Sequence, residues 1–325
     1  MKKSFLFLLL LAAFITGLTS CAQNKHKELI DKITAISGSG TPHNIIVMVA
    51  PGLTDERITQ ADQKNMMLPF LPVHAASHNP DEADMAVMAY ELAGKPDPLG
   101  EYAQTEAFKV TGYATNGDTA HPYVASFFVP GFDELAPNKI YEKEFTSEMN
   151  YSPVFLAGKG DFDSFFAETG NLHLNEVYKA QRVKTTTLSE AAAVIGNEDI
   201  LFTHSGHEDK HGAATKLYCI FDDATPAFNE LAQVALQWIK SKDEMDDGFF
   251  LVLTDTELDQ KDELASFDDA VAVASSFVAE SQDTLLLVIG PETRTVFAAG
   301  AGSSAFTGHD MSLSDISDTL LNFLQ

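Results

Sequence analysis

The sequence is poor in cysteine and in basic residues. Its 325 residues include two cysteines, Cys21 and Cys219, which excludes a small scaffold held together by disulfides. Lys and Arg number 21 against 47 Asp and Glu, giving a formal net charge of −26. Because nucleic-acid binding requires Lys and Arg to neutralise phosphates, this charge argues against a nucleic-acid partner. It also argues against direct docking on an anionic membrane surface.

The N-terminus carries the features of a targeting signal. Lys2 and Lys3 precede an apolar run from Phe5 to Ile15, which small and polar residues follow. This order is typical of a signal peptide, here residues 1–20. The apolar run is too short to cross a bilayer comfortably.

The signal ends in Leu18-Thr19-Ser20-Cys21, which resembles a bacterial lipoprotein box. In that kind of signal the cysteine becomes the lipidated first residue of the mature protein. The resemblance predicts attachment through Cys21 to a bacterial membrane in the cell envelope, facing the periplasm or the exterior. The alternative is an ordinary secretory signal with a chance cysteine. Lipidation leaves Cys219 as a single thiol, and its apolar neighbours predict that it is buried and inert.

The mature chain alternates strand-like runs with helical patterns. We interpret residues 21–41 as a tether with room for a short helix. The apolar runs 45–49 and 284–289 are typical of strands buried on both faces of a parallel sheet, and residues 262–278 have helical spacing. This alternation predicts one α/β domain over residues 42–325, with a mainly parallel sheet covered by helices.

The most specific motifs lie in the second half of the chain. The words DGFFLVLTDTELD, SFDDAVAV and GAGSSAFTG follow one another there. In wording, order and spacing they resemble the C-terminal half of the alkaline phosphatase family. Weaker resemblance in HNIIVMVAPGLT, VTGYATNGDTA, PVFLAGKGDFDSFF and DILFTHSGHEDK extends it over most of residues 43–325. The resemblance implies an alkaline-phosphatase-like sandwich, with a mainly parallel central sheet and helices on both faces.

The resemblance also implies a reaction. Alkaline phosphatases transfer a phosphoryl group from an ester to a serine hydroxyl and then to water, with two zinc ions and a nearby magnesium. Metals about 4 Å apart activate the attacking oxygen and hold the leaving oxygen. Of the family's metal ligands, this sequence keeps an aspartate at Asp259. Glu263 stands where the family has a histidine, and Asp255 lies beside a lost glutamate position.

The other family ligands have no counterpart. Pro51 stands at the aspartate of the first loop, Thr254 at the glutamate, and Gly290-Pro291 at the later Asp-His pair. The last ligand histidine and the phosphate-binding arginine are not found. Too few carboxylates and imidazoles remain for a dizinc centre.

Two other groups of residues keep a catalytic alternative open. Thr119, within Asp118-Thr119-Ala120, stands at the nucleophile position; the structural alternative is a turn threonine near a helix N-cap. His204, His207 and His211 have spacing compatible with an opportunistic metal site. An incidental solvated loop is the simpler interpretation of these histidines.

We therefore expect a catalytically inactive alkaline phosphatase homologue on the cell envelope, held by Cys21 and acting by binding or assembly. We expect no cofactor, and the sequence does not identify a protein or small-molecule partner. The alternative is a metal-dependent phosphomonoesterase with Thr119 as nucleophile, aided by Asp118, which uses zinc and magnesium at Asp255, Asp259 and Glu263. A structural lipoprotein without a ligand is a third class.

Overall fold

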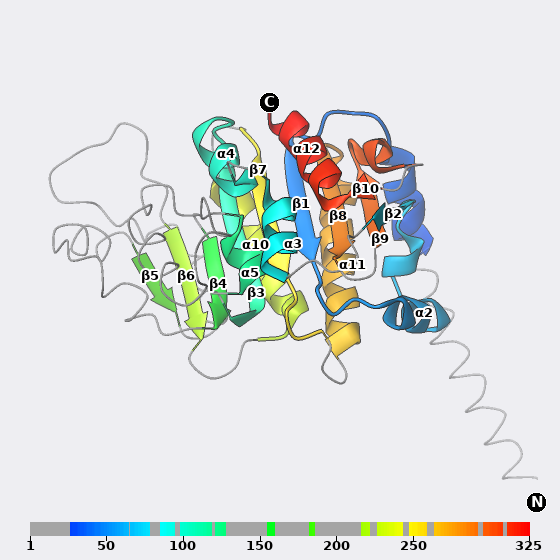
Figure 1. Ribbon diagram of the computed structural model, residues 1–325, viewed down its shortest axis with the longest axis horizontal. Helices are drawn as coiled ribbons and strands as arrows, with labels where there is room; N and C mark the ends of the chain where they lie inside the picture. Colours follow the sequence, from blue (N-terminus) through cyan, green and yellow to red (C-terminus); the bar gives the residue numbers. More distant parts are fainter. Residues whose placement is uncertain are drawn as a thin grey trace, which may run out of the picture.

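The computed structural model describes residues 27–64, 66–78, 85–94, 98–118, 121–127, 155–159, 182–185, 216–221, 226–242, 247–258, 263–291, 295–307 and 311–325. A sheet runs through them in the order β10-β2-β9-β8-β1-β7-β3-β4-β6-β5 (Figure 1). In chain order the strands are β1 (Asn44–Val49), β2 (Val73–His78), β3 (Val110–Asp118), β4 (Phe155–Lys159), β5 (Arg182–Thr185), β6 (Lys216–Phe221), β7 (Phe249–Thr254), β8 (Thr284–Gly290), β9 (Thr295–Gly300) and β10 (Met311–Ser312).

The sheet is mainly parallel, as the alternating pattern predicts. The neighbouring strands β8, β1, β7, β3, β4, β6 and β5 all pair in parallel. β9 pairs antiparallel with β8 and with β2. Every residue of β1, β7 and β8 is buried, because layers of helices cover both faces of these central strands.

The helices have the following bounds: α2 (Asp55–Gln63), α3 (Met85–Ala93), α4 (Leu99–Thr105), α5 (Pro122–Ala125), α10 (Phe228–Lys242), α11 (Glu263–Ser281) and α12 (Leu313–Leu324), with short 3-10 turns η1 (Leu68–Phe70) and η4 (Ser303–Phe306). One face of the sheet packs against α3, α4, α5 and α12, whose apolar residues share a cluster with Ile45, Val47 and Val49. None of the described helices is both long and apolar enough to cross a membrane.

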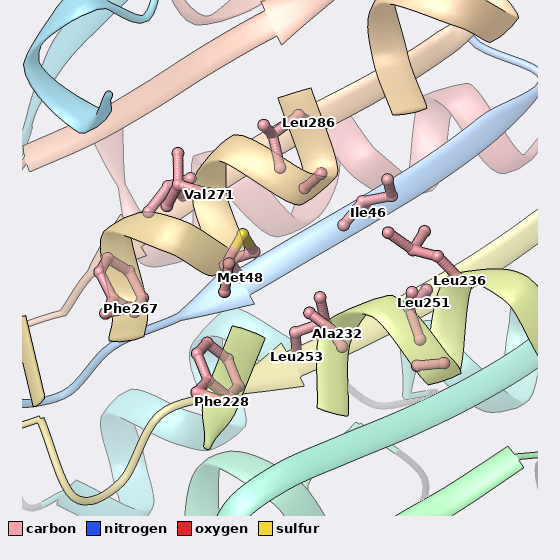
Figure 2. Close-up of a cluster of buried hydrophobic side chains, with 14 of the residues drawn as sticks. Ile46, Met48, Phe228, Ala232, Leu236, Leu251, Leu253, Phe267, Val271 and Leu286 are labelled. Atoms are coloured by element: carbon pink, nitrogen blue, oxygen red, sulfur yellow. The ribbon is translucent and has the colours of Figure 1, made fainter. Parts of the chain in front are cut away.

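The opposite face packs against α10 and α11. Ile46 and Met48 of β1 point into this second cluster, which Figure 2 shows together with Leu251, Leu253 and Leu286 from the neighbouring strands. Phe228 of α10 stacks on Phe267 of α11, with ring centroids 5.9 Å apart. Alternate residues of each strand thus feed two separate cores, and helices on both faces of an α/β sheet are confirmed.

Part of the predicted tether belongs to this structure. Residues 27–36 are helical, and Ile33 is fully buried in the α10–α11 cluster. The next residues bond to the end of β9: the Gly38 N–H donates to the carbonyl of Gly300 at 3.2 Å, and the Gly300 N–H donates to Ser37 Oγ at 2.8 Å. Residues 27–41 are therefore packed chain rather than a free tether, while the boundaries of the domain stay predictions.

Candidate functional site

The carboxyl ends of β8, β1, β7 and β3 lie side by side along one edge of the sheet. Their registers pair Val49 of β1 with Ile289 of β8 and with Thr254 of β7, and pair Thr254 in turn with Thr115 of β3. In open parallel sheets this edge is where ligands bind. The residues that follow each strand end are therefore the candidate site, which we call the carboxyl edge.

Asp255, directly after β7, is the centre of a hydrogen-bond network at the carboxyl edge. Its backbone N–H donates to the carbonyl of Val49 at 2.9 Å. Its Oδ1 accepts from Asn116 Nδ2 at 2.5 Å and from the N–H of Glu257 at 3.1 Å. The Asn116 Oδ1 accepts from the N–H of Thr256 at 2.9 Å. These bonds join the ends of β1, β7 and β3 around Asp255.

The loop after β7 lies directly against the end of β3. A Cβ atom built on Gly117 would overlap the hydroxyl Oγ1 of Thr256. A side chain at residue 117 would therefore push the two segments apart. The absence of a side chain lets Asn116 reach both Asp255 and the Thr256 N–H.

Two oxygens of the carboxyl edge have no hydrogen-bond partner among the described residues. They are Asp255 Oδ2 and Thr254 Oγ1, and both side chains are fully buried. Burial raises the pKa of the Asp255 carboxyl to about 7, and the charges of Glu263 and Glu257 add to the rise. The hydrogen bonds from Asn116 and Glu257 oppose it without cancelling it. Near neutral pH a large fraction of Asp255 is therefore the uncharged acid.

The metals that the sequence resemblance implies do not fit the described residues of the carboxyl edge. Pro51 and Pro291 follow β1 and β8 at this edge, and neither offers a side-chain ligand. Asp255 Oδ1 already accepts two N–H donors, so only Oδ2 remains for a cation. Within the described part of the chain, no three His, Cys, Asp or Glu side chains are grouped to hold a metal ion. A dizinc centre needs about twice that number.

The structure places only some of the predicted site residues. Asp255 lies at the centre of the carboxyl edge, and Glu263 is the half-buried first residue of α11, close enough to influence the Asp255 charge. Asp118 is the last residue of β3, where its backbone pairs with Lys159. The other predicted residues lie outside the described part of the chain: Thr119, Asp259, Cys21, His204, His207 and His211.

Sequence reasoning missed Asn116 and Gly117. Their signal is a change of residue type along β3, from Val110-Thr111-Gly112-Tyr113 to a small polar end, Asn116-Gly117-Asp118. Polar residues at the carboxyl end of a buried parallel strand mark the ligand edge. The partner of Asn116 could not be inferred, since Asp255 is 139 residues away in the sequence.

Comparison with solved structures identifies the fold. Alkaline phosphatase from the Antarctic bacterium TAB5 matches with a TM-score of 0.63 at 17% identity, covering 87% of this chain and 98% of that one. Alkaline phosphatase from the psychrophile Shewanella sp. matches with a TM-score of 0.53 at 15% identity, over 75% of this chain and 67% of that one. Alkaline phosphatase from Thermus thermophilus matches with a TM-score of 0.50 at 17% identity, covering 79% of this chain and 61% of that one.

A mutant of the TAB5 enzyme with magnesium bound matches with a TM-score of 0.63 at 15% identity, covering 88% of this chain and 99% of that one. No family model matches this sequence, and no curated protein matches it. At these identities the comparison shows the fold. The chain has the alkaline phosphatase fold, which confirms the architecture implied by the sequence resemblance.

Proposed function

We propose that this chain is a cell-envelope lipoprotein that uses the alkaline phosphatase fold for binding or assembly rather than for phosphate ester hydrolysis. The observation that carries the proposal is that the polar groups of the carboxyl edge form hydrogen bonds with one another. The best-placed carboxyl, Asp255, accepts N–H donors from Asn116 and Glu257 where a metalloenzyme would present oxygens to a cation.

The chemistry of this network favours a site without a cation. An N–H donor beside a carboxylate supplies the positive partner that a metal ion would otherwise supply. We therefore expect no resident metal or other cofactor.

The remaining parts of the proposal rest on the sequence. Lipidation at Cys21 would hold the chain on a bacterial membrane, facing the periplasm or the exterior. The formal charge of −26 disfavours nucleic acid as a partner. A protein or a small molecule is the partner class that fits, and the carboxyl edge is the surface on which we place it.

One observation favours a second candidate function, a metal-dependent phosphomonoesterase. Asp255 is a buried titratable group with an unpartnered oxygen, and such groups concentrate at functional sites because they cost stability elsewhere. In this alternative Thr119 is the nucleophile and Asp118 assists it. Zinc and magnesium would then be held by Asp255, Asp259 and Glu263, with the His204–His211 segment as a further source of ligands.

A phosphatase assay separates the two functions. Purified mature protein, supplied with zinc and magnesium at alkaline pH, is incubated with an aryl phosphate. We expect the same background phosphate release from the wild type and from Thr119→Ala. The matched control is Thr59→Ala, which alters an exposed threonine on α2. Turnover that Thr119→Ala abolishes and Thr59→Ala preserves would replace our proposal with the phosphomonoesterase.

A further inference from the structure

The end of β3 carries the only Asn-Gly pair in the sequence, Asn116-Gly117. Such a pair is chemically labile, because glycine has no side chain to keep its backbone nitrogen away from the preceding amide. In deamidation the Gly117 nitrogen passes its proton to solvent and bonds to Asn116 Cγ. The Cγ–Nδ2 bond breaks, and the nitrogen leaves as ammonia after taking a proton from solvent. Water then opens the cyclic imide, which leaves aspartate or isoaspartate at residue 116.

The folded chain restrains all of these reacting groups. The Gly117 N–H donates to Thr115 Oγ1 at 3.1 Å, so the nitrogen that would attack is engaged in a hydrogen bond. The Asn116 amide is fixed at both ends, by Asp255 Oδ1 at 2.5 Å and by the Thr256 N–H at 2.9 Å. Asn116 is also buried, which keeps solvent from the leaving nitrogen. Deamidation therefore requires that β3 first separate from the loop after β7.

The products of deamidation do not fit the network that Asn116 forms. An aspartate at residue 116 presents an acceptor to Asp255 Oδ1 where asparagine presents a donor, and above neutral pH the two carboxylates repel each other. Isoaspartate adds a methylene group to the main chain of β3. The segment has no room for it, since even a Cβ atom at Gly117 would overlap Thr256 Oγ1. The modified chain therefore loses the contact between β3 and the loop after β7.

We propose that Asn116-Gly117 is a deamidation site at which opening of the carboxyl edge becomes irreversible. Opening here means separation of the end of β3 from residues 255–257. The hydrogen bonds of Asn116 protect the site, and local opening exposes it. Asp255 Oδ2 has no partner among the described residues, so this contact is weaker than a fully bonded one. The inference holds for either function of the edge, because it depends on the network alone.

Peptide mass mapping of the purified mature protein tests the protection. The protein is incubated at mildly alkaline pH, once folded and once unfolded in urea, and modification at Asn116 is followed over time. We expect modification to be slower by about tenfold or more in the folded chain. Equal rates would show that the network gives no protection and would overturn the proposal. This comparison uses the wild type and does not depend on the folding of any variant.

Two substitutions of Asp255 test the role of its oxygen. Asp255→Ala removes the acceptor of Asn116 Nδ2. Asp255→Asn also removes the charge, but it keeps a carbonyl oxygen that can accept the same hydrogen bond. We expect Asn116 to be modified about tenfold faster in Asp255→Ala than in Asp255→Asn. The same rate in the two variants would contradict the proposal.

Asp268→Ala separates opening of the carboxyl edge from unfolding of the whole domain. Asp268 lies on α11 and accepts from the N–H groups of Met67 and Leu68, so its loss weakens the fold without removing a partner of Asn116. We expect folded Asp268→Ala to be modified at Asn116 at the wild-type rate. If it is modified as fast as Asp255→Ala, unfolding of the whole domain exposes the site and the proposal fails.

Discussion

Two buried aspartates show how differently the scaffold and the carboxyl edge are built. Asp268 of α11 accepts from the backbone N–H of Met67 and from that of Leu68, each at 2.8 Å, so both of its oxygens are used. Asp255 uses Oδ1 for two donors and leaves Oδ2 without a partner. Buried polar groups in proteins are nearly always satisfied. Asp268 follows this rule, and Asp255 departs from it.

The difference distinguishes a buried polar group with a structural role from one at a candidate functional site. Asp268 lies in the SFDDAVAV motif, and its role is to hold the 3-10 turn η1 against α11. Asp255 sits where the fold places its chemistry, at the end of a central parallel strand. We infer that the scaffold has been kept for stability, whereas the carboxyl edge keeps a group that weakens stability.

The largest expected effect is on the scaffold side of the comparison. Asp268→Ala would leave two buried backbone N–H groups without acceptors, at a cost of about 3–5 kcal/mol in the free energy of unfolding. Urea denaturation measures it. Asp269→Ala, the exposed neighbour on the same helix, should change the free energy by no more than about 0.5 kcal/mol. Equal effects of the two substitutions would show that Asp268 does not have this structural role.

The destabilising effect of the buried Asp255 carboxyl should appear as a dependence of stability on pH. In the unfolded chain Asp255 loses its proton near pH 4, whereas burial holds the pKa in the folded protein at about 7. Stability from the protonated acid is therefore fully present below pH 4. It is lost as the pH rises to 7, by about 3–4 kcal/mol in all.

Asp255→Asn imitates the protonated acid and removes this titration. We expect the variant to match the wild type near pH 4 and to be more stable at pH 8, as measured by urea denaturation across the pH range. Asp269→Asn is the control and should show no difference that grows with pH. If Asp255→Asn is less stable than the wild type at pH 8, Asp255 is a stabilising carboxylate like Asp268, and the comparison fails.

A smaller loss of stability should follow from adding a side chain where β3 contacts the loop after β7. Gly117→Ala brings a methyl group against Thr256 Oγ1 and should cost about 1–3 kcal/mol. Thr256→Ala removes that hydroxyl. The double variant should therefore recover most of the loss in a double-mutant cycle. Additive losses would mean that residue 117 is restricted by something other than Thr256.

The central sheet and its helices could be predicted from local patterns. The continuous apolar runs of β1 and β8 predict strands buried on both faces, and the structure confirms that both strands are buried. The apolar spacing of α11 predicts its helix. β5 could not be predicted, because its sequence Arg-Val-Lys-Thr is short and mostly polar and carries neither an apolar run nor a helical period.

The carboxyl edge was predictable only in part. The family resemblance indicates Asp255, which lies beside a lost glutamate position. Its partner Asn116 comes from a strand 139 residues earlier. The contact between Asp268 and Met67 spans 201 residues. Local periodicity carries no information about pairs so distant in sequence. The same limit explains why residues 27–41 were assigned to a tether, since only tertiary packing reveals that Ile33 is buried.

Thermal unfolding with and without metal tests the central claim most directly. Any ligand that binds the folded chain raises its stability, by about 2.7 kcal/mol at a concentration 100 times its Kd. Our account predicts that zinc and magnesium leave the Tm of the wild type unchanged. They should likewise leave the Tm of Asp255→Asn unchanged. A rise in Tm for the wild type that Asp255→Asn abolishes would show that the carboxyl edge still holds a metal, and would contradict the account.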